Sequence, residues 1–241
     1  MTNPMHQFLI KELIPIHIAG YNISFTNSAL FMVLATCLIM LIQVWALRGQ
    51  TLIPTKIQAL YEIGYEFVAG VVHDNAGGDD ARKFFPFIFS LFLFVLMGNM
   101  LGMLPYGFTF TSHIVVTFAL AIMVFTTVTA IGFSRHGMHY FQLFCPAGLP
   151  IAVAPLVILV EVISYLMRPI TLSLRLFVNM MAGHMILKLF GAFTVMMGLW
   201  GFAPLAFIVG MTAFEFFIAG LQAYVFTILT CVYLNDALHL H

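Results

Sequence analysis

Charged residues are scarce in this chain of 241 residues. Only 7% are Asp, Glu, Lys or Arg, whereas 62% are hydrophobic, and the mean hydropathy is +1.06. A soluble globular domain carries about 25% charged residues, so this composition excludes one and indicates a polytopic membrane protein. Nine basic residues balance nine acidic ones. A neutral chain without a basic tract gives no reason to expect a nucleic-acid partner.

Cysteine is equally sparse, and its spacing shows no metal or redox pattern. The three cysteines are Cys37, Cys145 and Cys231. An odd number of widely separated thiols argues against a disulfide framework. The paired histidines near residues 136–139 and 239–241 lack cysteine or carboxylate partners at ligand spacing. We therefore expect no bound metal and no cofactor.

Long apolar runs divide the chain into membrane spans. A spanning helix needs about 20 apolar residues, and five segments reach this length. They are residues 28–48, 84–103, 112–133, 149–190 and 202–235. Residues 54–72 repeat apolar side chains every three or four positions, which predicts an amphipathic helix on the membrane surface. Residues 1–27 are too polar to span and form a lead-in on the outer side. The predicted fold is a single all-α, polytopic membrane domain.

The basic residues predict the orientation of the chain. If the first span runs inward, five basic residues lie on the inner side, and only Lys11 lies on the outer side. The five are Arg48, Lys56, Arg82, Lys83 and Arg135. Inner loops of membrane proteins are enriched in Lys and Arg. We therefore expect the N-terminus outside and the C-terminus inside.

The fourth apolar segment carries charges that a membrane helix normally avoids. A charged side chain at the bilayer centre costs between about 3 and well over 10 kcal/mol, so such residues usually face a partner or a water-filled cavity. Glu161, Arg168 and Arg175 are spaced by seven residues, which keeps them within a narrow stripe of the helix, and Asn179 lies one turn further on. A straight helix of about 60 Å would need a tilt near 60°, so we expect a bend, at Pro169, or a strong inclination.

The last two segments are joined by a short apolar connection, which predicts an antiparallel hairpin. If Arg175 is level with Gln222, then His184 lies about 13 Å and Glu215 about 10 Å closer to the tip, which makes them neighbours. On the inner side, Glu161 and Asp236 each lie fourteen positions away and form a second polar level. The sequence thus predicts a permanent cation between a titratable pair and a carboxylate level.

Structural explanations of the same residues remain open from the pattern alone. Arg175 can pair with a carboxylate of its own bundle, and Arg168 can satisfy carbonyls freed by Pro169. Asn99 and Gln222 can serve as hydrogen bonds between helices. Lys188 fits a side chain that extends to the outer interface, and Asp236 fits a solvated helix end.

Two motifs in the second half resemble a known family. Residues 173–184, SLRLFVNMMAGH, and residues 214–234, FEFFIAGLQAYVFTILTCVYL, are similar to the signature segments of subunit a of F-type ATP synthases. Pro86 and the stretch from Asn99 to Pro105 add to this resemblance. It implies an inclined helical hairpin packed on a ring of c subunits, with two offset proton half-channels. The further partners that it implies are the peripheral-stalk b subunits, other ATP synthase subunits and the lipid bilayer.

The resemblance also implies residue roles. Arg175 matches the essential arginine, which pairs with the ring carboxylate and blocks direct proton passage. The residues implied along the proton path are Asn99, Glu161, Asn179, His184, Glu215, Gln222 and Asp236. The order of the His184 and Glu215 pair resembles mitochondrial and related bacterial chains. The implied role is a non-catalytic, proton-translocating subunit in a bacterial inner membrane or, alternatively, the mitochondrial inner membrane.

A stand-alone secondary ion transporter is the competing hypothesis, because it would also carry intramembrane charges. Such transporters often show repeated halves with interrupted helices near the midplane, and the two halves of this chain are unlike each other. An intramembrane enzyme would show a nucleophile with its base, or a metal motif such as HExxH, and the sequence contains neither. Activity of the chain without a ring of partner subunits would favour the transporter.

Overall fold

The computed structural model describes residues 9–15, 17–18, 21–22, 24–48, 55–77, 82–104, 107–144 and 153–239. Five helices in this part of the chain are long and apolar enough to cross a membrane. They are α1 (Asn27–Leu47), α3 (Phe85–Gly102), α4 (Ile114–His136), α5 (Ala154–Met196) and α6 (Phe202–Leu238). The predicted all-α polytopic fold is confirmed, and the five helices lie in the five apolar segments of the sequence.

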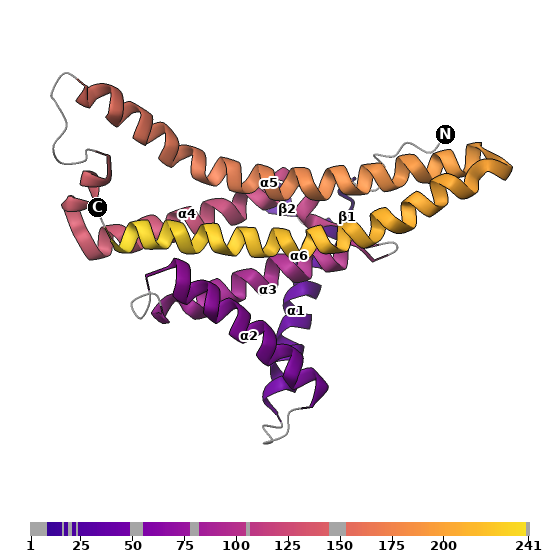
Figure 1. Ribbon diagram of the computed structural model, residues 1–241, viewed down its shortest axis with the longest axis horizontal. Helices are drawn as coiled ribbons and strands as arrows, with labels where there is room; N and C mark the ends of the chain where they lie inside the picture. Colours follow the sequence, from indigo (N-terminus) through magenta and orange to yellow (C-terminus); the bar gives the residue numbers. More distant parts are fainter. Residues whose placement is uncertain are drawn as a thin grey trace.

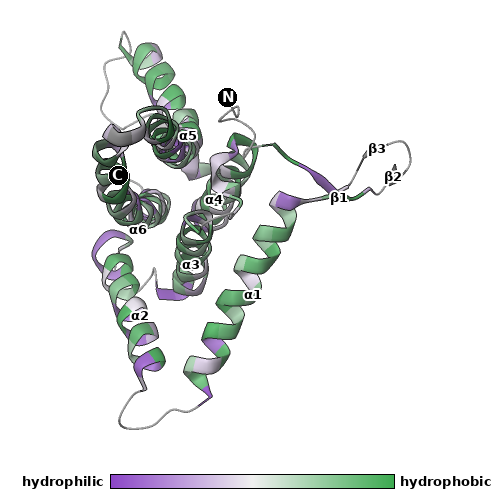
Figure 2. Cartoon of the chain, turned by 90° about the vertical axis from the view of Figure 1, so that its right-hand side faces the viewer, coloured by the Kyte–Doolittle hydropathy of each residue, from purple (hydrophilic) through white to green (hydrophobic). Residues whose placement is uncertain are grey.

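The helix α2 (Lys56–Asn75) occupies the segment predicted to be amphipathic. Hydrophilic and hydrophobic residues alternate along its length, whereas α1 is more uniformly hydrophobic (Figure 2). Val68, Val71 and Val72 are buried, whereas Leu60 and Ile63 are 72% and 65% exposed. One apolar stripe therefore packs on the protein, and a second remains available to the membrane surface.

Four helices form a bundle, and two lie across it. The helices α3 to α6 run roughly alongside one another in Figure 1 and are seen nearly end-on in Figure 2, where α1 and α2 appear from the side. The largest cluster of buried apolar side chains joins α2 with these four helices and includes Ile88, Val124, Leu172, Met180 and Phe226. This core holds α5 and α6 in a fixed position along the bundle.

The hairpin of α5 and α6 turns through a short 3₁₀ helix, η5 (Gly198–Gly201), and its two arms have 43 and 37 residues. At 1.5 Å per residue, α5 is about 65 Å long, roughly twice the thickness of a bilayer core. It stays helical throughout but bends in its first half, where it leads away from α6 (Figure 1). Pro169 lies in the helix interior, and Thr171 Oγ1 donates to the carbonyl of Met167 at 2.9 Å. Both features bend helices.

The expected start of this element at residue 149 lies outside the described residues, which resume at Val153. Its helix continues to Met196, six residues past the expected end. The apolar character of the Gly191 to Met196 stretch made it a loop candidate as readily as a helix end, since periodicity does not distinguish the two over so short a run.

The lead-in contains short strands that the sequence did not predict. In the described part, β1 (Glu12–Ile14) pairs antiparallel with β4 (Phe25–Thr26), and β2 (His17–Ile18) pairs with β3 (Tyr21–Asn22). Directly after β4, Thr26 caps α1 by accepting a hydrogen bond from the Ala29 amide at 3.3 Å. The described part of this segment therefore contains paired strands before the first helix, whereas the sequence predicted none.

Candidate functional site

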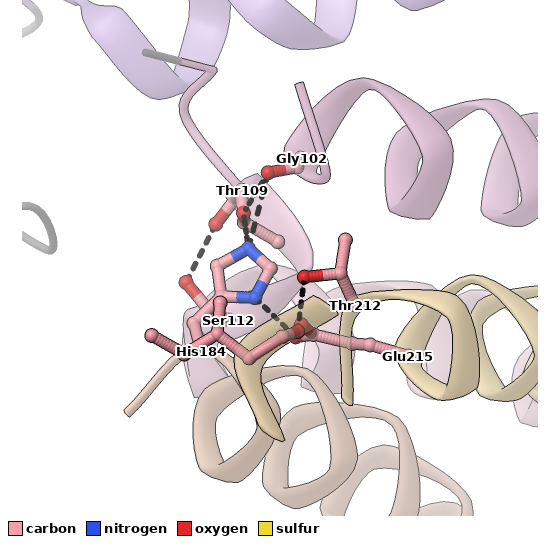
Figure 3. Close-up of polar contacts among 7 residues, drawn as sticks. Gly102, Thr109, Ser112, His184, Thr212 and Glu215 are labelled. Atoms are coloured by element: carbon pink, nitrogen blue, oxygen red, sulfur yellow. Dashed lines mark hydrogen bonds and ion pairs between the residues drawn. The ribbon is translucent and has the colours of Figure 1, made fainter. Parts of the chain in front are cut away.

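A histidine and a glutamate form a buried pair where α5 faces α6. The Nδ1 atom of His184 lies 2.5 Å from Oε1 of Glu215, and the residues are 6% and 3% exposed. The two side chains point toward each other from the two arms of the hairpin, and Thr212 lies beside the same carboxylate (Figure 3). The expected proximity of these two residues is therefore confirmed. A pair so enclosed must be neutral overall, because burial of an uncompensated charge is very costly.

The other nitrogen of the imidazole ring determines which protons the pair carries. His184 Nε2 lies 2.7 Å from Thr109 Oγ1 and 3.1 Å from the carbonyl oxygen of Gly102 (Figure 3). The Thr109 hydroxyl donates to that same carbonyl, so it accepts from Nε2. With Nε2 protonated, one further proton is shared between Nδ1 and Glu215. The pair is an imidazolium with a carboxylate, or an imidazole with a carboxylic acid, and interconversion moves a single proton.

Two glycines make room for this arrangement. A Cβ atom at Gly183 would collide with Oε1 of Glu215, and one at Gly102 would come within 2.5 Å of Thr109 Oγ1. Real Cβ atoms do not make contacts this short. The absence of a side chain at each position therefore lets a polar group lie directly against the helix that carries the glycine.

Thr109 was missed by the sequence analysis. It precedes the short 3₁₀ helix η3 (Phe110–Ser112), in the connection between α3 and α4, and its carbonyl accepts from Ser112 Oγ at 2.6 Å. A polar run, Thr109 with Thr111 and Ser112, between two apolar spans was the available signal. Its contact with a histidine 75 residues away depends on how this connection crosses α5, which residue spacing does not report.

The same connection contributes further buried polar atoms. Thr111 Oγ1 and His113 Nε2 are buried and have no hydrogen-bond partner among the described residues. The ring of His113 stacks on Phe108 with 5.1 Å between centroids. Burial lowers the pKa of His113, because it disfavours the charged imidazolium. Buried polar atoms thus lie in the connection that also supplies Thr109 to His184.

A buried amide lies between the pair and the middle of the hairpin. Asn99, on α3, is fully buried and donates through Nδ2 to the carbonyl of Ala219 on α6 at 3.2 Å. Ala219 stands one turn after Glu215 and three residues before Gln222. Within the described chain, Asn99 Oδ1, Glu215 Oε2 and Gln222 Nε2 are all buried without a hydrogen-bond partner. Such atoms along one seam favour water-mediated contacts.

The central cation lies beside a pair of amides and is open to the outside of the chain. Asn179 Nδ2 donates to Gln222 Oε1 at 2.7 Å, and Arg175 stands one turn before Asn179. Arg175 is exposed, and within the described residues no carboxylate lies within ion-pair distance of it. The exposed apolar residues around it on the two arms include Leu174, Val178, Phe217 and Leu221.

At the end of the hairpin away from its tip, the structure differs from the predicted level of Glu161 and Asp236. Asp236 forms an ion pair with Arg168, with 2.9 Å between NH1 and Oδ2. Glu161 is partly exposed and lies two turns before Arg168 on α5. The expected register placed Arg175 level with Gln222, whereas Asn179 meets it, a shift of one turn. The bend of α5 then carries Glu161 further from the end of α6.

The described residues contain no group of three or more His, Cys, Asp or Glu side chains that could hold a metal ion. The polar groups of the hairpin are instead suited to holding and passing protons. They run from Thr109 and the His184–Glu215 pair, along Asn99 and the amides, to a guanidinium on the open face.

Known proteins are similar in sequence to this chain over its whole length. The family described as ATP synthase A chain matches residues 29–235. ATP synthase subunit a of Rhodospirillum rubrum is 54% identical over 242 residues, and that of Paramagnetospirillum magneticum is 52% identical over 248, each covering 100% of both chains. That of Pelagibacter ubique is 51% identical over 242 residues, covering 100% of this chain and 99% of its own. The resemblance indicated by residues 173–184 and 214–234 is confirmed, and the chain belongs to the ATP synthase A chain family.

Proposed function

We propose that this chain is the proton-conducting subunit a of the Fo sector, and that its hairpin loads and unloads a carboxylate on a rotating ring of c subunits. The observation that carries this proposal is the exposure of Arg175 on an apolar, membrane-embedded face. A bare guanidinium facing lipid would cost several kcal/mol or more, so its carboxylate partner is expected on another chain. Arginine suits this position because it keeps its proton even when partly buried.

The path from the outer side begins at the connection between α3 and α4. Protons reach His184 and Glu215 past Thr109, exchange through the proton shared by the pair, and continue along Asn99 toward the open face. Asn179 and Gln222 hold each other beside Arg175 and define where the ring carboxylate is met. On the inner side, Glu161 lies on the same stripe as Arg175 and marks the outlet.

Arg175 separates the two paths. An opposite charge within about 4–6 Å lowers a carboxylate pKa by about 1–3 units, so the passing ring carboxylate gives up its proton there. The same positive charge repels a proton moving directly between the half-channels. Each charge moved through 100 mV releases about 2.3 kcal/mol, and the barrier makes that energy available to rotation.

In this proposal the chain moves protons and does not itself catalyse ATP chemistry. The exposed apolar surfaces of the hairpin and of α1 require cover by other ATP synthase subunits, the ring and the peripheral-stalk b subunits among them, or by lipid. We place the protein in a bacterial inner membrane, with its N-terminus outside and its C-terminus inside. The high identity to bacterial subunits supports this location.

Arg175→Ala tests the proposal in inverted membrane vesicles that carry the complete enzyme. We expect ATP synthesis to fall to the background of the assay, while vesicles stripped of the soluble sector keep a proton leak that depends on the ring. Arg175→Lys is the matched control, which retains a charge but can lose it, and should keep partial function. Normal ATP synthesis by Arg175→Ala would refute the assigned role. Proton transport by the chain alone in liposomes would favour the transporter.

A further inference from the structure

The two arms of the hairpin separate at their inner end, and one ion pair lies where they separate. α5 bends in its first half, and the part before the bend leads away from α6 (Figure 1). Arg168 directly precedes Pro169, and Asp236 lies two residues before the end of α6. Their 2.9 Å contact therefore joins the arms where α5 bends away from α6.

Aromatic side chains hold the guanidinium of Arg168 in place. Its Cζ atom lies 5.3 Å from the ring centroid of Tyr165 and 4.9 Å from that of Tyr233, within the range of cation–π attraction. The Tyr165 hydroxyl lies 2.9 Å from the Tyr140 hydroxyl and 2.6 Å from Thr129 Oγ1. Tyr165 and Tyr233 thus contact the cation from α5 and α6, while α4 and the 3₁₀ helix η4 (Gly137–Phe144) hold the Tyr165 ring in place.

The charges of Arg168 and Asp236 cancel each other. Arg168 lies two turns before Arg175 on the same stripe of α5, a separation of about 10 Å along the helix. Asp236 neutralises Arg168, whereas Arg175 has no such partner within the described residues. The side chains of Arg168 and Asp236 are 20% and 35% exposed, so the pair is partly shielded from solvent. Of the two arginines on the stripe, Arg175 is therefore the one whose charge acts at full strength on a mobile proton.

We propose that Asp236 is a positioning counter-charge for the inner outlet, which cancels the field of Arg168 and fixes the end of α6, and that it is not itself a proton carrier. The proposal rests on the proposed function, because it concerns the same proton path. The proposal predicts that removing Asp236 and removing Arg168 change the attraction for protons in opposite directions. Loss of Asp236 leaves a cation that repels protons at the outlet, and loss of Arg168 leaves a carboxylate that attracts them.

The sign of each effect follows from the groups that face the pair. These are Tyr140 on η4, Tyr165 and Arg175 on α5, and Tyr233 on α6, while His136 on α4 contacts the carbonyl of Leu238 just beyond. Apart from Arg175, the side chains named here are tyrosines and a histidine, so no second carboxylate or guanidinium among them compensates for a lost charge. Asp236→Asn lowers the local proton concentration, and half-maximal flux then requires a more acidic inner solution. Arg168→Gln raises the local proton concentration and shifts the pH dependence of the proton flux to more alkaline pH.

The test compares Asp236→Asn, Arg168→Gln and their double variant in inverted vesicles, whose medium contacts the inner face. After removal of the soluble sector, proton flux driven by a potassium diffusion potential is measured against the pH of the medium. We expect the single variants to shift the midpoint by about half a pH unit or more, in opposite directions, for a unit charge within roughly 10 Å in a partly shielded site. The double variant should return to within about 0.2 units of the unchanged protein.

Rates of ATP-driven proton pumping by the complete enzyme provide a second measurement. We expect Asp236→Asn to be slowest, at least about fivefold below the unchanged protein, because it leaves an unpaired and partly buried charge. The double variant should recover most of this loss. Glu66→Gln, which neutralises an exposed carboxylate on α2, is the control and should have no effect.

Equal losses in all three variants with unshifted pH profiles would overturn the proposal, because they would show a purely mechanical contact. Wild-type behaviour of all three would overturn it as well. Arg175→Ala is measured in the same membranes. If Arg175→Ala is inactive while the pair variants behave normally, only the counter-charge proposal fails; if Arg175→Ala is fully active, the proposed function fails.

Discussion

The titratable pair near the tip of the hairpin and the cation in its middle differ in burial and in whether this chain supplies their partners. His184 and Glu215 are almost completely buried and satisfy each other, with Thr109 and Gly102 completing the ring of partners. Arg175 is exposed and has no ion-pair partner among the residues described. The His184–Glu215 ion pair is formed within this chain, with Glu215 Oε2 left without a hydrogen-bond partner among the described residues, whereas Arg175 has no counter-charge there. Under the proposed function, the groups that relay a proton are preorganised within this chain, while Arg175, the group proposed to meet the ring, stays open.

The largest expected effect comes from breaking the buried pair. Glu215→Gln and His184→Ala each remove one partner of the shared proton, and we expect ATP synthesis to fall at least about tenfold, because a buried polar group loses its partner. The exchange His184→Glu with Glu215→His keeps both groups and should retain more activity than either single change. ATP synthesis in vesicles measures all three. Equal loss in the exchange and the single variants would show that the residues do not work as a pair.

An intermediate effect is expected from Gly183→Ala, which tests how closely the pair is enclosed. The new Cβ atom would collide with the Glu215 carboxylate, so the carboxylate or α6 must move. We expect proton conduction to fall by about five- to tenfold, at the low end of overpacking costs of about 1–3 kcal/mol. Gly191→Ala, whose Cβ meets nothing within 4 Å, is the matched control in the same helix. Normal conduction by Gly183→Ala would mean that this contact is readily relieved.

The smallest effect is expected from Thr109→Val. It removes the acceptor at 2.7 Å, but the Gly102 carbonyl remains near Nε2. One hydrogen bond contributes about 1 kcal/mol, so we expect conduction to fall by about two- to fivefold. Thr109→Ser restores the hydroxyl and should restore the rate. If the serine variant is as slow as the valine variant, the hydroxyl is not what Thr109 supplies.

Most helices could be predicted from the sequence, because length and hydropathy determine membrane spans almost by themselves. The neighbourhood of His184 and Glu215 was also predictable, since a helix rises by a constant amount per residue and the two residues lie near the tip, where errors of register are smallest. The ion-pair partner of Asp236 could not be predicted from the sequence. A one-turn error at Gln222 and the bend at Pro169 add up away from the tip of the hairpin, so Asp236 meets Arg168, two turns from Glu161, beside which it was expected to lie.

The sequence also did not predict the contacts made by segments that connect one helix to the next. Thr109 approaches His184 because the chain after α3 folds back over α5, and no periodic pattern specifies such a path. The short strands of the lead-in were missed for a related reason. Runs of two or three residues are below the length at which alternation indicates a strand.

The uninterrupted helix through the bend of α5 has a consequence for how the subunit tolerates changes in length. One residue inserted before Glu161 turns only the start of α5 by about 100° and leaves Arg168, Arg175 and His184 in phase with α6. The same insertion between Arg175 and Asn179 would instead turn the arginine away from the contact between Asn179 and Gln222. Natural variation in the length of this helix should therefore accumulate before Glu161.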